Sequence, residues 1–85
     1  MKSFHPHIYC VKIHGGIHQA RGLPDIVGVA NGYFFGLEVK MPGKEHTVTE
    51  IQAKKLDDID AAGGITGVVT SVQQAIEIIE EEVFS

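Results

Sequence analysis

The alternation of apolar and polar positions along the chain predicts four short strands. Their segments are residues 8–13 (IYCVKI), 25–30 (DIVGVA), 33–40 (YFFGLEVK) and 65–70 (ITGVVT), all rich in β-branched or aromatic residues. Asn31-Gly32 separates the second segment from the third. This dipeptide is the strongest short hairpin signal, because a type I′ turn needs positive φ at both central positions. The sequence therefore predicts a tight hairpin over residues 25–40.

A 3.6-residue apolar period predicts a first helix after this hairpin. Pro42-Gly43 ends the third strand segment, and Thr47 with Glu50 three residues later is a candidate capping box for a helix to about Ala62. Gln52, Leu56 and Ile59 are spaced i, i+4 and i+7, so they share one helix face. Gly63-Gly64 then provides a C-terminal cap.

A second helix is predicted at the end of the chain. Ser71, with Gln74 three residues later, is its candidate cap, and its apolar stripe consists of Val72, Ala75, Ile76, Ile79 and Val83. The expected order is β-β-β-α-β-α. This order predicts an α/β fold in which helices flank a small mixed sheet, and residues 1–85 form a single domain.

Several classes of protein are excluded by composition. No apolar run approaches the roughly 18 residues that a membrane span needs, and no apolar segment of a signal peptide follows Lys2. Cys10 is the single cysteine, so the chain forms no internal disulfide and no cysteine-based zinc site. We therefore expect a cytoplasmic protein that makes no contact with a membrane.

The charges are divided unevenly along the chain, although the net charge is −4. Residues 1–56 contain all seven Lys and Arg, all five His and four acidic residues, whereas residues 57–85 contain seven acidic residues and no basic one. One part of the surface could therefore be positive while another is acidic. An acidic terminal helix that only promotes solubility explains the same pattern, so charge alone does not decide between them.

The predicted hairpin brings charged residues together. If Asn31 and Gly32 are the two turn residues, cross-strand partners have numbers that sum to 63, and Asp25 lies opposite Glu38. Directly opposed residues share a sheet face with Cβ atoms roughly 4.5–5.5 Å apart. Lys40 lies two residues beyond Glu38 and therefore on the same face. The pattern predicts two carboxylates and one ammonium group on a common surface.

Two opposed carboxylates destabilise a strand pair unless they share a proton or a cation. Mg²⁺ suits such a pair, because it binds one or two carboxylates together with water and phosphate oxygens. The plainer alternative is an ion pair at a strand end, with Asp25 capping the turn after Pro24. A bulge at Gly28 or Gly36 would also break the pairing.

These motifs resemble those of a known nuclease family. Pro24-Asp25 followed by Glu38-Val39-Lys40 is similar to the PD-(D/E)xK nuclease motif. The longer segments 22–27 (GLPDIV) and 38–43 (EVKMPG), with Gln52 downstream, resemble the virus-type replication-repair nuclease (VRR-NUC) domain. The resemblance covers roughly residues 8–76 and implies a restriction-endonuclease-like core and, in so short a chain, a phage origin.

The resemblance implies a role for each motif residue. Asp25, Glu38 and the backbone carbonyl of Val39 would bind Mg²⁺ or Mn²⁺. Lys40 would be the catalytic lysine, and Gln52 would support the lysine or the attacking water. Many family members also carry a metal-binding glutamate on a helix before the first strand, and this sequence has no acidic residue before Asp25.

The expected function is a metal-dependent endodeoxyribonuclease that cleaves Holliday junctions or other branched DNA as a homodimer. So small a chain has little surface with which to grip DNA, and this favours two copies. The alternative from another class is a DNA-binding or assembly module that has kept the fold and lost activity. A small ligand-binding domain unrelated to DNA is a third hypothesis.

Other basic residues are weaker candidates for contacts with DNA phosphates, and each could equally be a solvated surface charge. They are Lys12, Arg21, Lys44, Lys54 and Lys55. His14 and His18 are four residues apart, but Gly15-Gly16 between them disfavours the helix that a zinc site would need. We interpret these histidines as polar loop residues.

Overall fold

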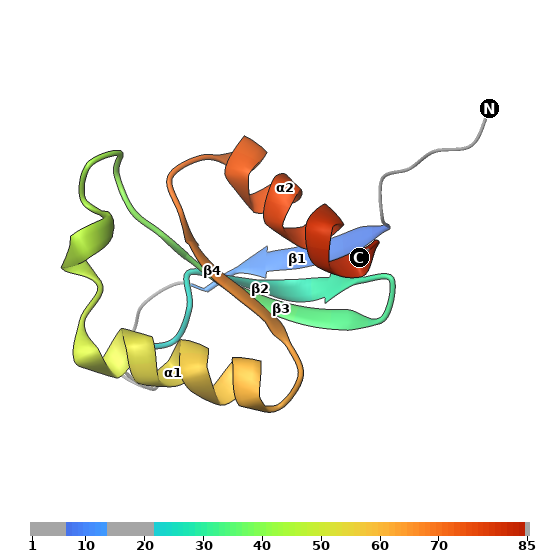
Figure 1. Cartoon of the computed structure of the whole chain (residues 1–85), viewed down its shortest axis with the longest axis horizontal. Helices are drawn as coiled ribbons and strands as arrows, with labels where there is room; N and C mark the ends of the chain where they lie inside the picture. Colours follow the sequence, from blue (N-terminus) through green and yellow to red (C-terminus); the bar gives the residue numbers. More distant parts are fainter. Residues whose placement is uncertain (1–6, 14–21, 85) are drawn as a thin grey trace.

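The computed structural model describes residues 7–13 and 22–84. These residues form a four-stranded mixed sheet with helices packed on it (Figure 1). In chain order the elements are β1 (Ile8–Lys12), β2 (Ile26–Ala30), β3 (Tyr33–Val39), the 3-10 turn η1 (Glu45–Thr47), α1 (Glu50–Ala61), β4 (Ile65–Val69) and α2 (Val72–Val83). The small α/β fold with a mixed sheet is confirmed. The order differs from the expected one by η1, which the sequence pattern did not predict.

The strands lie side by side in the order β1-β2-β3-β4. β1 and β2 are antiparallel, as are β2 and β3, whereas β3 and β4 are parallel. Asn31 (φ 49°) and Gly32 (φ 88°) both have positive φ, as the predicted hairpin turn requires. Partners in the hairpin run without a break from Ala30↔Tyr33 to Ile26↔Leu37, so their numbers sum to 63 and the predicted register is confirmed.

Neither Gly28 nor Gly36 forms a bulge, because the pairing of β2 with β3 is continuous. Both glycines lie where a side chain would collide with its neighbours. A Cβ on Gly28 would lie 2.7 Å from the Phe35 ring, and a Cβ on Gly36 would lie 2.8 Å from Ile59 Cδ1 of α1. On the opposite face, a Cβ on Gly67 would lie 2.9 Å from Ile78 Cδ1 of α2. The two helices therefore cover opposite faces of β3 and β4 (Figure 1).

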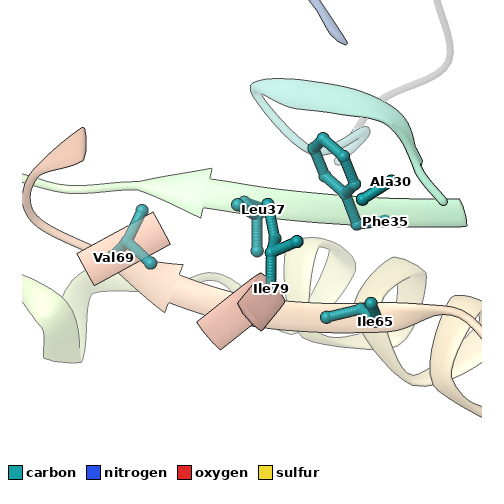
Figure 2. Close-up of a cluster of buried hydrophobic side chains, with 6 residues drawn as sticks. All are labelled: Ala30, Phe35, Leu37, Ile65, Val69 and Ile79. Carbon is teal, nitrogen blue, oxygen red and sulfur yellow. The ribbon is translucent and has the colours of Figure 1, made fainter. Parts of the chain in front are cut away.

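The buried core lies between α2 and the sheet. It comprises Ala30, Phe35, Leu37, Ile65, Val69 and Ile79, shown in Figure 2. Val72, predicted to lie on the apolar stripe of α2, is 76% exposed at the first position of the helix, whereas Ile78 packs against the core instead. Among the described residues, no helix is long and apolar enough to cross a bilayer.

The first helix begins two residues later than predicted. Thr47 belongs to η1, where its Oγ1 donates to the Lys44 carbonyl, and it does not cap α1. Thr49 caps α1 instead: its Oγ1 accepts from the Gln52 N–H over 3.1 Å, and Gln52 Oε1 accepts from the Thr49 N–H over 2.9 Å. This reciprocal pair is a complete capping box. It fixes the Gln52 side chain at the start of the helix.

Candidate functional site

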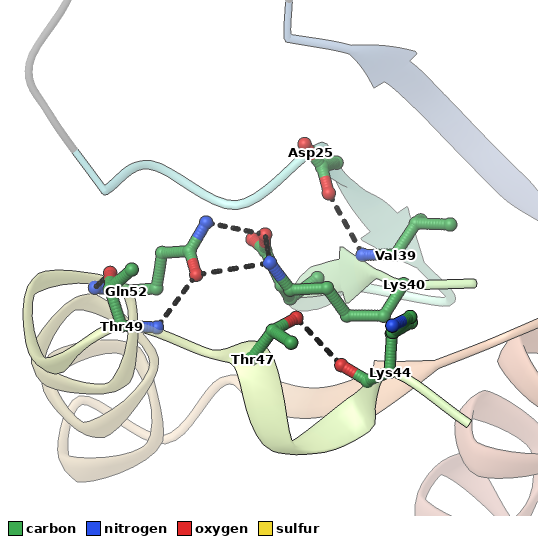
Figure 3. Close-up of polar contacts among 8 residues, drawn as sticks. Asp25, Val39, Lys40, Lys44, Thr47, Thr49 and Gln52 are labelled. Carbon is green, nitrogen blue, oxygen red and sulfur yellow. Dashed lines mark hydrogen bonds and ion pairs between the residues drawn. The ribbon is translucent and has the colours of Figure 1, made fainter. Parts of the chain in front are cut away.

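The candidate site lies at the end of the sheet opposite the hairpin turn. β3 runs from the turn to Val39, and β1 runs parallel to it, so Lys12 and Val39 lie at the same end. Figure 3 shows Asp25, Lys40 and Gln52 gathered at this end, from three segments of the chain. The predicted Glu38 belongs to the same cluster.

Asp25 is positioned by the residues on either side of it. Pro24 before it is fully buried, and its Cγ lies 3.0 Å from where a Gly36 Cβ would be. After it, the Asp25 carbonyl accepts from the Ile13 N–H over 2.7 Å, and its Oδ2 accepts from the Val39 N–H over 2.9 Å. Asp25 lies one residue before β2 and was predicted to be part of it. Its side chain thus continues the hydrogen bonding of the hairpin beyond the last backbone pair.

Glu38 is an acidic side chain in the interior, with only 2% of its surface exposed. Its Oε2 accepts from Gln52 Nε2 over 2.7 Å and lies 3.6 Å from Lys40 Nζ. Its Oε1 is buried and has no hydrogen-bond donor. A buried carboxylate oxygen without a partner is costly when the group is charged. Among the described residues, this is the one buried side-chain oxygen or nitrogen without a hydrogen-bond partner.

The environment of Glu38 favours its neutral form. Burial raises the pKa of this carboxyl above its usual value of 4.5, and the neighbouring Asp25 carboxylate raises the pKa further. The Lys40 ammonium acts in the opposite direction and lowers the pKa. The Asp25 and Glu38 carboxyls are close enough to hydrogen-bond if one of them carries a proton. The predicted pairing of the two acids is therefore present, and it is electrostatically unfavourable without a bound proton or cation.

Gln52 connects the lysine to the glutamate. Its Oε1 accepts from Lys40 Nζ over 3.3 Å as well as from the Thr49 N–H, and its Nε2 donates to Glu38 (Figure 3). Because the Thr49 N–H can only donate, the amide oxygen must face it, and the amide nitrogen must then face Glu38. Thr49 is the site residue that sequence reasoning missed. Its signal was a second, overlapping capping box, Thr49-x-x-Gln52.

The oxygen ligands available to a cation come from two carboxylates and one backbone carbonyl. In an extended strand the N–H and C=O of one residue point to the same side, so the Val39 carbonyl faces the side on which its N–H meets Asp25. Asp25 and Val39 also line a hollow with Lys12 and Ile26. Within residues 7–13 and 22–84, no group of three or more His, Cys, Asp or Glu side chains could hold a metal ion. Hard oxygen donors and an unpartnered Glu38 Oε1 fit Mg²⁺ or Mn²⁺.

The other predicted phosphate contacts separate into two groups. Lys12, Lys44 and Lys55 lie on the segments that surround the site, at the end of β1, after β3 and one turn beyond Gln52. Lys54 is on the other side of α1 and is paired with Asp58, so the structure does not bring it to the site. Arg21, His14 and His18 lie outside the described residues.

The sheet topology also places the acidic residues of α2 away from the site. β4 is parallel to β3, so it ends at the site, and α2 runs from there back toward the hairpin (Figure 1). The acidic residues in the later part of α2, Glu77 and Glu80 to Glu82, are therefore distant from the site. The end that carries Lys12, Lys40 and Lys44 is free of this acidic cluster. Comparisons with protein-family models, curated proteins and solved structures gave no match.

Proposed function

We propose that this chain is a divalent-metal-dependent endodeoxyribonuclease with a restriction-endonuclease-like core, related to VRR-NUC domains. The observation that carries the proposal is the buried Glu38 Oε1 without a donor, beside a second carboxylate and an ion-paired lysine. An ordinary ion pair at a strand end, the plainer alternative, would not bury an acceptor without a partner. A bound cation would give this oxygen a partner and would offset the repulsion between the two carboxylates.

Asp25, Glu38 and the Val39 carbonyl would hold Mg²⁺ or Mn²⁺. The ion would supply positive charge for the scissile phosphate and would make water a better nucleophile. Lys40 is held by Glu38 and Gln52, so its ammonium group is ready to orient the water or to neutralise charge that develops on the phosphate. Gln52 keeps the lysine in place and leaves Glu38 Oε1 free.

The charge distribution supports DNA as the substrate. Lys12, Lys44 and Lys55 could contact phosphates on either side of the cleaved bond, while the acidic part of α2 lies at the far end of the molecule. We propose branched DNA as the preferred substrate and a homodimer in the host-cell cytoplasm as the active form, because one small chain offers little surface for a duplex.

Cleavage of labelled DNA tests this proposal. A four-way junction and a linear duplex are incubated with Mg²⁺, Mn²⁺ or EDTA. We expect cleavage only with metal, and its loss in Asp25→Asn, Glu38→Gln and Lys40→Ala. Glu77→Gln neutralises an exposed carboxylate on α2. It is the matched control and should retain wild-type cleavage. Full cleavage by any of the three site variants would contradict the role given to that residue.

A non-catalytic DNA-binding module with the same fold is the second candidate. The observation in its favour is the small number of metal ligands. The described cluster contains two carboxylates and no third acidic side chain. Calorimetry separates the two candidates. A nuclease should bind Mn²⁺ in a way that Asp25→Asn abolishes, whereas DNA binding without Mn²⁺ heat and without cleavage would favour the binding module.

A further inference from the structure

β1 is an edge strand whose apolar residues are all exposed. Ile8 and Cys10 on one face of β1 and Tyr9 and Val11 on the other are all exposed, and 70% of Tyr9 is exposed. β4 at the other edge is different, because its residues are buried or half-buried beneath the two helices. A flat apolar edge is a template for pairing with another strand unless something protects it. Lys12 is the one charged residue on β1.

The hydrogen bonds to β2 determine which backbone groups of β1 face outward. The Ile13 N–H donates to the Asp25 carbonyl, and the His7 carbonyl accepts from the Asn31 N–H. Odd-numbered residues of β1 therefore direct their N–H and C=O groups toward β2. The even-numbered residues Ile8, Cys10 and Lys12 direct theirs away from the sheet. Cys10 is at the centre of this outward set.

We infer that β1 pairs antiparallel with β1 of a second copy of this chain, about a twofold axis at Cys10. In this register Cys10 lies opposite the partner's Cys10, and Ile8 lies opposite the partner's Lys12. All three outward residues of each copy then exchange both backbone hydrogen bonds with an outward residue of the other. The result is one continuous sheet made from the strands of both copies.

The strand is self-complementary, which is what identifies a second copy as the partner. A twofold interface requires that one surface fit itself, and this register opposes the lysine ammonium to an isoleucine and never to another lysine. Moving the twofold axis by one residue along β1 in either direction gives a less favourable register. It would place Lys12 opposite Pro6, which has no N–H, or Ile8 opposite His14, beyond the end of β1.

The pairing has a consequence for both sites. Between antiparallel strands the twofold axis is perpendicular to the sheet, so the α1 face of each copy lies on the same side of the joined sheet. Glu38 shares that face with Gly36, which α1 covers. Two site clusters would therefore open toward one surface. On the same face, Tyr9 would meet the partner's Val11 and extend the exposed apolar row Tyr9, Val29 and Phe34.

The inference names the interface of the proposed homodimer, but its test needs neither DNA nor metal. Sedimentation velocity over a wide range of protein concentrations should show a dimer for the wild type and for Cys10→Ser. Cys10→Lys opposes two ammonium groups at the axis and should be monomeric, with an unchanged circular dichroism spectrum. Cys10→Pro removes an outward N–H and none that faces β2, which an edge strand tolerates, and it should also be monomeric.

Cross-linking tests the register. A short bismaleimide should join two wild-type copies through Cys10 and should fail with Cys10→Ser. In the Cys10→Ser background, a mixture of the Ile8→Cys and Lys12→Cys proteins should cross-link between the two variants. Ile8→Cys alone should not, because its two copies would be about 13 Å apart at roughly 3.3 Å per residue.

Three outcomes would overturn the inference. The first is a wild-type protein that stays monomeric at every concentration, and the second is a Cys10→Lys protein that remains a dimer. The third is a dimer whose cross-links follow another register or another surface. A monomeric wild type would also contradict the proposed dimeric form of the nuclease. The proposed chemistry is tested separately, by metal-dependent nicking of linear duplex DNA by the wild type and by Cys10→Lys.

Discussion

Gln52 donates from its Nε2 to Glu38 Oε2 over 2.7 Å, and the same side chain closes the capping box of α1. One amide therefore stabilises the start of a helix and holds the candidate catalytic lysine and metal-binding glutamate. The two tasks can be separated by experiment, because α2 offers a glutamine in the same helical position. Gln74 is also three residues after its cap, and its Oε1 accepts from the Thr70 N–H, with no bond to Lys40 or Glu38.

Gln52→Ala should lose both stability and cleavage, whereas Gln74→Ala should lose stability alone. Each variant removes the side chain of a cap and should lower the free energy of unfolding by ~1 kcal/mol. Only Gln52→Ala leaves Lys40 and Glu38 without their common partner. Urea denaturation and cleavage rates measure the two effects. Equal cleavage by both variants would show that the amide serves the helix only.

The metal-free protein should become less stable as the pH rises through the pKa of Glu38. Burial raises this pKa in the native state, so the native state holds the proton more tightly than the unfolded chain. The free energy of unfolding therefore falls with rising pH between the unfolded and native pKa values and is level above them. Glu38→Gln should remove this component when the two proteins are compared in EDTA. A difference between the two proteins that does not change with pH would contradict the assignment.

Asp25→Asn should fold normally and lose metal binding. Its amide oxygen can still accept from the Val39 N–H, and the repulsion from Glu38 is gone. In EDTA its melting temperature should equal or exceed that of the wild type. Mn²⁺ should raise the melting temperature of the wild type only. Asp25→Ala leaves the Val39 N–H without this acceptor and should be destabilised by ~1 kcal/mol in EDTA, which separates the structural role from the metal-binding role.

Gly36→Ala should displace α1 and weaken the site without touching it. The added methyl would lie 2.8 Å from Ile59 Cδ1 and 3.0 Å from Pro24 Cγ, and overpacking of this kind costs about 1–3 kcal/mol. Ile59→Val removes the Cδ1 atom, so the double variant should be more stable than the sum of the two single effects predicts. If the changes in the free energy of unfolding are strictly additive, Ile59 Cδ1 is not the atom with which the added methyl collides.

The sequence was most informative where a short-range rule determines long-range geometry. Asn31-Gly32 fixes a two-residue turn, and from that turn alone the register that opposes Asp25 to Glu38 follows. Helix boundaries were less well determined. Thr47 and Thr49 each begin a candidate capping box in the sequence. In the structure Thr49 caps α1, whereas Thr47 lies in η1 and donates to the Lys44 carbonyl.

Features that depend on packing could not be predicted. The burial of Glu38 results from α1 lying across β3, and nothing in the strand pattern indicates that its Oε1 lacks a donor. The pairing of Lys54 with Asp58 is an exception, because it follows the i, i+4 rule and its signal is present in the sequence. The functional roles of Asp25, Glu38, Lys40 and Gln52 stay predictions until cleavage is measured.

Because Gln52 belongs to both the capping box and the site, local unfolding at the start of α1 also disrupts the site. When the first turn of α1 frays, the bond from the Thr49 N–H no longer orients the Gln52 amide, and Lys40 and Glu38 lose their common support together. Exchange of the Thr49 amide hydrogen with solvent therefore reports how often the site is disassembled in the native protein. A ligand that tightens the site should slow that exchange, even though the amide itself need never touch the ligand.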